Sequence, residues 1–221
     1  MSNYKEEYFK NDSLLKSLGT IEQYGIDLKN RRLYLVGEID IETAQEVSQQ
    51  LLFLTSEIHF PSSYLDPITL IINSPGGCDD MMYYLYDSVT TCPAEVVSIG
   101  TGMVCSAAVL ILACADRRYA TSNCWLMTHK GKANIEGDDD EIASQAELNA
   151  KLSDRYWKLL ERHSTKTALQ WYKKSKSEGE LWLDAEGMIK WGLIDGIIIP
   201  KRRQFEPLST RKLKIKEEED D

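Results

Sequence analysis

GMVCSAAVLIL, residues 102–112, joins a strand-like run to an apolar helical run and places one serine between them. Residues 96–99 have the pattern of a buried strand and residues 107–115 that of a helix, so Ser106 is expected at the bend between them. Free N–H groups and the positive end of the helix dipole favour negative charge developing at such a place. The alternative for the same serine is an ordinary helix N-cap.

Two earlier segments repeat this strand–helix pattern. Residues 33–36 and 68–72 are predicted strands, and helices are expected after each of them, the first capped by Asp40. The predicted buried helix faces consist of Ala44, Val47, Leu51 and Leu54, and of Met81, Tyr84, Leu85, Ser88 and Val89. Three successive pairs predict an α/β fold with parallel strands joined by right-handed crossovers. The loops after such strands line one crevice, so Gly76, Gly77 and Ser106 are expected to face each other.

The second half of the chain is predicted to extend this sheet. Residues 124–128 form a further strand that delivers His129, and residues 141–163 form a helix of about 35 Å at 1.5 Å per residue, long enough to project from the domain. A surface helix packed along its own domain is the alternative. Ser164 is expected to cap a helix through Trp171, and Asp184 a short one that ends at Gly192. Residues 193–199 are the last predicted strand.

Composition excludes several classes of protein. With 221 residues, 43% of them hydrophobic, the chain is expected to form one globular domain. Its net charge of −9 argues against a general nucleic-acid binder, and no apolar run or leader typical of a membrane span or secretory signal is visible. The five cysteines form no CxxC pair, which favours free thiols in a reducing, cytoplasmic compartment over disulfides or a metal site.

Nucleophilic catalysis by serine needs a base, a group that orients the base, and donors for the oxyanion. Histidine is the usual base, and His129 is the one histidine at a predicted strand end, whereas His59 lies in a loop and His163 at the end of a charged helix. Gly76 and Gly77 let a backbone N–H approach a substrate closely. Taken separately, these residues also fit a structural histidine and a simple turn.

Four motifs in this order resemble the Clp-type serine peptidase subunit: INSPGG at 72–77, GMVCSAAVLIL at 102–112, LMTHKG at 126–131 and LDAEGMIKWGLID at 183–195. The resemblance implies the repeated crossover superhelix shared by ClpP and crotonases, with a protruding handle helix. It also implies Ser106 as nucleophile, His129 as general base, and the backbone N–H groups of Gly77 and Ala107 as the oxyanion hole. The expected parts are an N-terminal arm (1–25), a peptidase domain (26–200) with its handle region at about 124–163, and a charged, disordered tail (201–221).

The chain departs from this family at two positions. An ungapped count back from the WGLID motif places Glu180 where the family carries aspartate, and glutamate can also fix the imidazole tautomer. Asp184 or Glu178 taking that role, or no residue at all, are the alternatives. Ala107 replaces the family's methionine, which keeps the backbone donor. Cys105 is expected to be a small buried filler and not a second nucleophile.

The resemblance further implies an assembly. Members stack two seven-membered rings, and a Clp-class AAA+ unfoldase feeds unfolded polypeptide to serines inside; ATP is used by that partner alone, so no metal or organic cofactor is expected in this chain. A catalytically weak or inactive ring subunit that acts as a scaffold in a mixed Clp complex is one alternative. Acyl-CoA chemistry of the crotonase kind is another, but it does not require a Ser–His pair.

Overall fold

The computed structural model describes residues 25–131 and 136–199. The predicted arm lies outside this range except for its last residue, and the predicted tail lies wholly outside it. The elements follow the chain in the order β1 (Arg32–Ile39), α2 (Ile41–Leu54), β2 (Ile68–Gly77), α3 (Asp79–Thr90), β3 (Val96–Cys105), α4 (Ala107–Ala113), β4 (Arg117–Thr121), β5 (Trp125–His129), α5 (Asp139–Arg162), α6 (Ala168–Glu178), β6 (Glu180–Leu183), α7 (Ala185–Trp191) and β7 (Gly196–Ile198).

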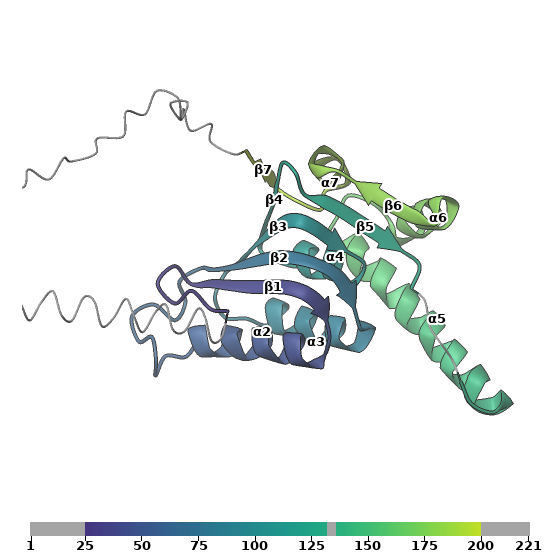
Figure 1. The fold of residues 1–221 in the computed structure, drawn as a ribbon, viewed down its shortest axis with the longest axis horizontal. Helices are drawn as coiled ribbons and strands as arrows, with labels where there is room; N and C mark the ends of the chain where they lie inside the picture. The colour runs from purple at the N-terminus through teal and green to yellow at the C-terminus, as the bar shows by residue number, and fades with distance from the viewer. Residues whose placement is uncertain (1–24, 132–135, 200–221) are drawn as a thin grey trace, which may run out of the picture.

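One sheet organises the described part of the chain. Its strands run in the order β1-β2-β3-β4-β7, and all of these neighbours are parallel. Strand β5 pairs in parallel with β3 and antiparallel with β6, which forms a branch on the same sheet (Figure 1). The predicted α/β fold with parallel, crossover-connected strands is therefore confirmed.

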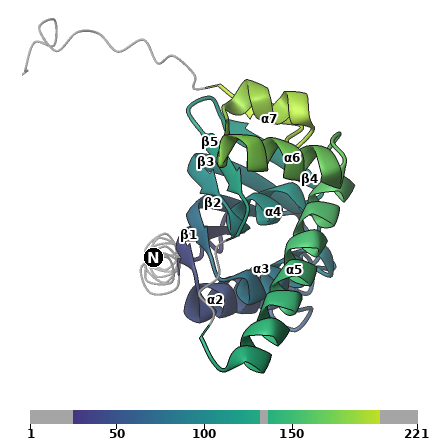
Figure 2. The same ribbon diagram turned by 90° about the vertical axis from the view of Figure 1, so that its right-hand side faces the viewer.

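The helices α2, α3 and α4 lie together on one face of this sheet (Figure 2). Every second residue of β2 is buried toward them, as in the run Ile68, Leu70 and Ile72, each with no exposed surface. All seven residues of α4 are buried. A helix that is apolar on every side is stable only when it is surrounded by protein, so α4 forms the centre of the core.

Strand β3 changes its partner halfway along its length. Residues 97–100 pair with β4, and residues 103–105 pair with β5. Gly102 makes the change possible, since its φ of +59° is open to glycine and strained for other residues. The Asn73 side chain bridges the resulting shift by accepting a hydrogen bond from the Met103 N–H at 3.1 Å. Both β2 and β3 thus continue as strands through the glycine motifs where the sequence predicted loops.

Several elements differ from the sequence prediction. Strands β4 and β6 were not predicted, because β4 buries one residue of five and β6 has four residues in all. Helix α3 buries Met82 with Leu85 and Val89, whereas Tyr84, predicted to be buried, is 44% exposed. Helix α6 is capped by Thr167 and not by Ser164, whose hydroxyl instead accepts the Trp171 indole N–H at 2.9 Å.

The predicted long helix is confirmed as α5, and it projects from the body (Figure 1). It begins earlier than expected because Asp138 and Glu141 form a reciprocal capping box. Its buried residues, Trp157, Leu159 and Leu160, all lie near its C-terminal end. The alternative of a helix packed along its own domain is therefore wrong for the first half of α5. No helix within residues 25–131 and 136–199 is long and apolar enough to cross a membrane.

Candidate active site

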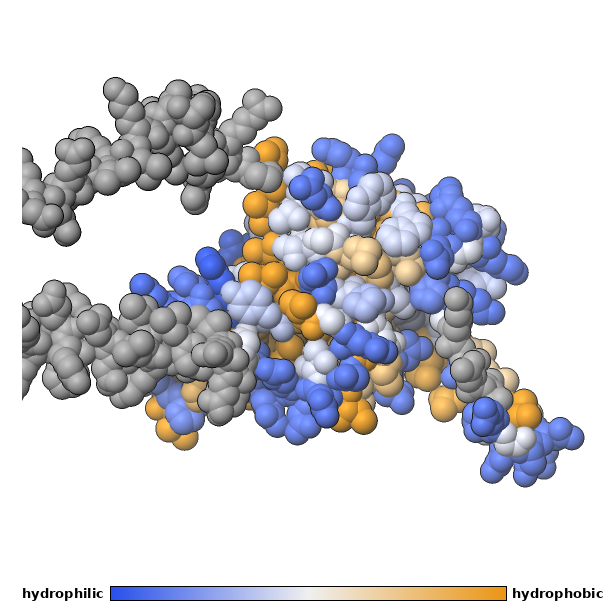
Figure 3. All heavy atoms as spheres, in the orientation of Figure 1, coloured by the Kyte–Doolittle hydropathy of each residue, from blue (hydrophilic) through white to orange (hydrophobic). Residues whose placement is uncertain are grey.

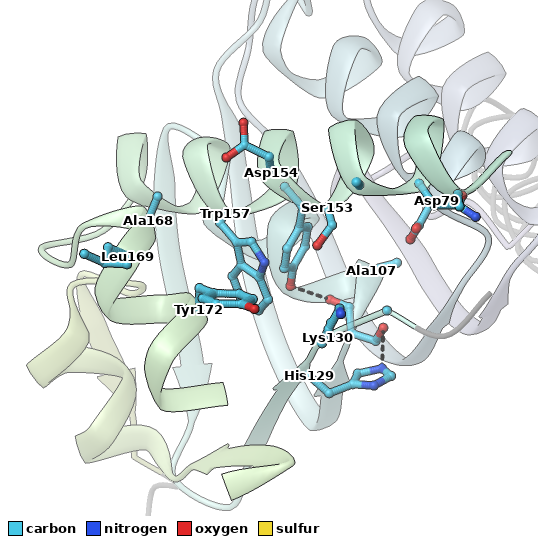
Figure 4. A pocket seen from close by; sticks show the side chains of 16 residues that line it. Asp79, Ala107, His129, Lys130, Ser153, Asp154, Trp157, Ala168, Leu169 and Tyr172 are labelled. Atoms are coloured by element: carbon cyan, nitrogen blue, oxygen red, sulfur yellow. Dashed lines mark hydrogen bonds between the residues drawn. The ribbon is translucent and has the colours of Figure 1, made fainter. Parts of the chain in front are cut away.

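Ser106 occupies the bend between β3 and α4, as predicted, but it does not cap the helix. Its backbone has φ +52° and ψ −121°, a conformation that serine rarely adopts, and its side chain makes no capping hydrogen bond. The Ser106 hydroxyl instead shares a hydrogen bond with Nε2 of His129, at 3.0 Å (Figure 4). The structure therefore excludes the N-cap explanation and brings the two predicted residues together.

The register of β3 and β5 explains this contact. Cys105, the last residue of β3, lies opposite Met127 of β5, and the Ser106 N–H donates to the Met127 carbonyl at 2.7 Å. The chain of β5 then ends two residues later at His129. Because β3 and β5 run in parallel, both end at the same edge of the sheet, and Ser106, which follows β3, lies beside His129, the last residue of β5. His59 and His163 are engaged elsewhere, against Phe53 and the Tyr86 hydroxyl.

Tyr156 of α5 supports the same bend. Its hydroxyl donates to the Ser106 carbonyl at 3.1 Å and shares a second hydrogen bond with Thr128 Oγ1 at 3.0 Å. Burial raises the pKa of Tyr156, which keeps the hydroxyl protonated and able to donate. No sequence signal distinguishes this tyrosine from a core residue, because its partners come from distant strands.

Of the two glycines, Gly76 lies against the serine. A Cβ on Gly76 would lie 2.7 Å from the Cys105 carbonyl oxygen, 2.8 Å from Ser106 Cβ and 2.9 Å from the Ala107 nitrogen. A Cβ on Gly77 would instead collide with the backbone of Ile39 in β1. Ala107 lines the cavity at Ser106, and as the first residue of α4 its N–H has no partner within the helix.

The predicted acid lies beside His129 but forms no hydrogen bond with it. Glu180 is opposite His129 in the β5–β6 register, yet its carboxylate accepts the Trp182 indole N–H at 3.2 Å. The two alternatives are occupied: Asp184 accepts the Gly187 N–H at 2.8 Å as the cap of α7, and Glu178 pairs with Lys174. Residues directly opposite each other have Cβ atoms about 5 Å apart, so among these acids Glu180 is the one placed to reach the imidazole.

A cavity of about 720 Å³ opens beside Ser106 and His129. Its walls include aromatic rings of Tyr156, Trp157 and Tyr172, and the carboxylate of Asp79 (Figure 4). Partial burial raises the pKa of Asp79, and the neighbouring Asp80 raises it further, whereas His129 acts in the opposite direction. No motif in the sequence distinguishes Asp79 from other acidic residues at the start of a helix.

The other candidate nucleophile and a metal site find no support in the geometry. Cys105 is 3% exposed, and burial raises the pKa of its thiol, so it is the predicted buried filler and not a second nucleophile. All five cysteines are free thiols. In the described parts of the chain, no group of three or more His, Cys, Asp or Glu side chains is placed to hold a metal ion.

The fold and the Ser–His pair are those of a serine-type peptidase. A family model described as Clp protease matches residues 17–201, so the chain belongs to the Clp protease family. It is 32% identical over 179 residues to an ATP-dependent Clp protease proteolytic subunit 2 of Pseudomonas aeruginosa, covering 79% of this chain and 84% of that protein. It is also 32% identical over 173 residues to a proteolytic subunit 2 of Treponema denticola, covering 77% and 82% respectively.

A solved structure supports the same assignment. A ClpP1 mutant from Listeria monocytogenes superimposes with a TM-score of 0.68 at 27% sequence identity, covering 79% of this chain and 94% of that one. The resemblance inferred from the four motifs is confirmed. Membership of the Clp protease family favours peptide-bond hydrolysis over the acyl-CoA alternative.

Proposed function

We propose that this chain is an active serine endopeptidase subunit in which Ser106 and His129 cleave peptide bonds. The observation that carries the proposal is the 3.0 Å hydrogen bond between the Ser106 hydroxyl and His129 Nε2 at the wall of a cavity. A nucleophile and base within hydrogen-bond reach are the geometric requirement for acyl transfer.

In the proposed reaction, the Ser106 hydroxyl attacks the carbonyl carbon of the scissile bond as its proton passes to His129 Nε2. The N–H groups of Ala107 and Gly77 stabilise the oxyanion, and the Ser106 backbone conformation sets the hydroxyl toward the substrate. His129 then returns the proton to the leaving amine. Water hydrolyses the acyl group on Ser106 by the reverse sequence, with Glu180 orienting the imidazole through Nδ1.

The proposed setting is a double heptameric ring of this chain. The first half of α5 would join the two rings as a handle, and a Clp-class AAA+ unfoldase would supply unfolded polypeptide and use the ATP. Contacts between subunits are supported by Figure 3, in which hydrophobic residues gather over the strands on the face shown and remain exposed in a single subunit. Met103, Trp125 and Trp182 are between 44% and 48% exposed. The free thiols support a reducing compartment such as the cytoplasm.

The test is active-site labelling of the full chain with a fluorophosphonate, followed by Ser106→Ala. We expect labelling of Ser106 and a kcat/KM for small fluorogenic peptides that falls by roughly 10³-fold or more in the variant. Chelators are expected to leave the wild-type rate unchanged. Labelling that persists in Ser106→Ala would show that the wrong serine has been assigned.

A second candidate function is a ring subunit that is inactive by itself and serves as a scaffold for an active homologue. The Glu180 carboxylate favours it, because it is held by Trp182 and not by His129. Activity that appears only after mixing with a complete paralogue would support this function. Under the first function, Glu180→Gln lowers kcat at least about tenfold, whereas Trp182→Phe, which releases the carboxylate, does not.

A further inference from the structure

Asp79 brings a carboxylate into the cavity of the proposed active site. It is the first residue of α3, two residues after the glycine pair, and it lines the cavity together with Ser106 and His129. A Cβ built on Gly131 would lie 3.8 Å from Asp79 Oδ2, so the carboxylate stands over the backbone two residues beyond His129. In the view of Figure 4, Asp79 and the pair of Ala168 and Leu169 lie at opposite ends of the cavity.

The negative charge of Asp79 is not balanced by an ion pair within the described residues. No cation in residues 25–131 or 136–199 forms an ion pair with it, although Lys130 lines the same cavity. The other acid of the cavity, Asp154, is paired with Lys158 at 2.6 Å. Partial burial and Asp80 raise the pKa of Asp79, with His129 acting in the opposite direction, and its charged form has no ion pair to offset the burial. A cation supplied by a ligand would provide one.

The remaining walls suit a long side chain with a charged end. Ala107 and Gly131 are small residues on the side of the cavity where Asp79 lies, and they leave room there, whereas Trp157 and Tyr172 lie toward the opposite end (Figure 4). The methylene stems of lysine and arginine pass beside uncharged surface while their charged ends reach a polar partner. A carboxylate matches guanidinium well, because it accepts two parallel hydrogen bonds from it.

We propose that Asp79 makes this peptidase prefer a lysine or arginine on the acyl side of the scissile bond. The acyl residue is the one joined to Ser106 during the reaction, so its side chain is held nearest to the cavity beside that serine. This inference rests on the proposed function of Ser106. It assigns the substrate class from a residue outside the Ser–His pair.

The experiment compares peptide aminocoumarin amides that differ only in the residue before the coumarin: arginine, lysine, leucine or glutamate. For the full-length protein we expect kcat/KM for the arginine peptide to exceed that for the leucine peptide by roughly tenfold or more. Asp79→Asn should lower this ratio by roughly tenfold, mostly through KM of the arginine peptide. Added salt should weaken the preference, because it screens the charge pair.

Asp80→Asn is the matched control. Both acids lie in the first turn of α3, so both substitutions remove one charge and the same favourable helix-dipole interaction, but Asp80 does not line the cavity. The arginine-to-leucine ratio should stay within about twofold of wild type in Asp80→Asn. An equal fall of the ratio in both variants would overturn the proposal, because the effect would then be one of net charge.

A binding measurement separates this proposal from the proposed function. Isothermal titration of the arginine and leucine peptides into Ser106→Ala, with and without Asp79→Asn, needs no turnover. We expect tighter binding of the arginine peptide, lost with Asp79→Asn. Equal affinities for the two peptides would overturn the Asp79 proposal even if Ser106 cleaves peptides. Absence of cleavage by wild type, together with arginine-selective binding, would overturn the proposed function alone.

Discussion

Ser106 adopts a backbone conformation that costs about 1–3 kcal/mol for a residue with a Cβ and persists only where the surroundings impose it. Three contacts impose it here. The Ser106 N–H is bound by the Met127 carbonyl, its own carbonyl is bound by the Tyr156 hydroxyl, and Gly76 packs against the bend with no side chain between. Neighbours from β2, β5 and α5 thus hold the Ser106 backbone in its strained conformation.

Gly76→Ala tests this at the residue scale. The new Cβ would overlap the backbone at Cys105 and Ala107, so we expect kcat/KM to fall at least about 100-fold, with a stability loss of about 1–3 kcal/mol. Gly37→Ala is the control, because Gly37 also has a positive φ but no atom near its Cβ position. It should lose stability through backbone strain and retain activity; loss of activity in both would contradict the steric argument. Peptidase assays and denaturant titrations measure the two effects.

Helix α5 has two different halves, and each has its own environment. The C-terminal half packs one face against the body and carries Tyr156 to the serine, whereas the N-terminal half is exposed and projects from the body (Figure 1). A single helix therefore connects the proposed active site to the proposed interface between rings. Displacement of α5 along its axis would move the Tyr156 hydroxyl relative to Ser106.

Tyr156→Phe is the element-scale prediction for activity. The substitution keeps the ring but leaves the Ser106 carbonyl and Thr128 hydroxyl without their shared partner, so we expect about 1–3 kcal/mol of lost stability and a lower kcat. Tyr172→Phe is the control, since Tyr172 also lines the cavity and its hydroxyl makes no hydrogen bond to any described residue. Equal kinetics for the two variants would contradict a positioning role for Tyr156.

The C-terminal cap of α5 predicts a pH dependence of stability. Burial lowers the pKa of His163, as do Arg118 and Arg162, and its ring contacts the Tyr86 hydroxyl at 3.0 Å. Below about pH 6.5 the unfolded chain therefore binds a proton at His163 more readily than the folded chain. The free energy of unfolding should fall as the pH drops from about 7 through this window.

His163→Asn should reduce that loss, measured by denaturant titration at pH 7.5 and at pH 5. The Asp195 carboxylate does not interfere in this range, because its ion pair with Arg118 lowers its pKa below the ordinary value for aspartate. His59→Asn, at an exposed loop position, is the control and should keep the wild-type loss. An unchanged pH dependence in His163→Asn would contradict the assignment.

At the scale of the whole molecule, the chain leaves apolar surface that a lone subunit does not cover. On the projecting half of α5, Ile142 is 39% exposed and Leu148 is 55% exposed. Figure 3 shows this end of the helix as mostly hydrophilic with isolated hydrophobic residues. Isolated apolar side chains are common on protein surfaces, so the proposed contact between copies rests on the projection of this half of α5 from the body (Figure 1).

Leu148→Asp tests the assembly. We expect native mass spectrometry of the wild type to show a large homo-oligomer of the 25.2 kDa chain and the variant to shift toward smaller species, because a charge is costly to bury at an interface. Ala143→Asp introduces the same group on another side of the exposed helix and should leave the mass distribution unchanged. A monomeric wild type would contradict the proposed ring.

The fold could be predicted where the residue pattern is local and strong. The apolar runs at β1, β2 and β3, the caps at Asp40 and Asp184, and the long helix were all visible in the sequence, because burial and capping act over a few neighbouring residues. Strands β4 and β6 were missed, because these short segments become strands only through pairing with β3 and β5.

The candidate site, like the fold, could be predicted only in part from the sequence. The sequence by itself determined which serine and which histidine to consider, since each follows a predicted strand at the carboxyl edge of the sheet. Only the tertiary structure decided that Gly76 packs against the bend, that Tyr156 binds it and Asp79 lines the same cavity, and that Glu180 faces His129 while bound to Trp182. The physical reason is that hydrogen bonds and steric contacts depend on atoms brought within a few ångströms by strand register, and register is a property of the folded sheet, not of any one segment.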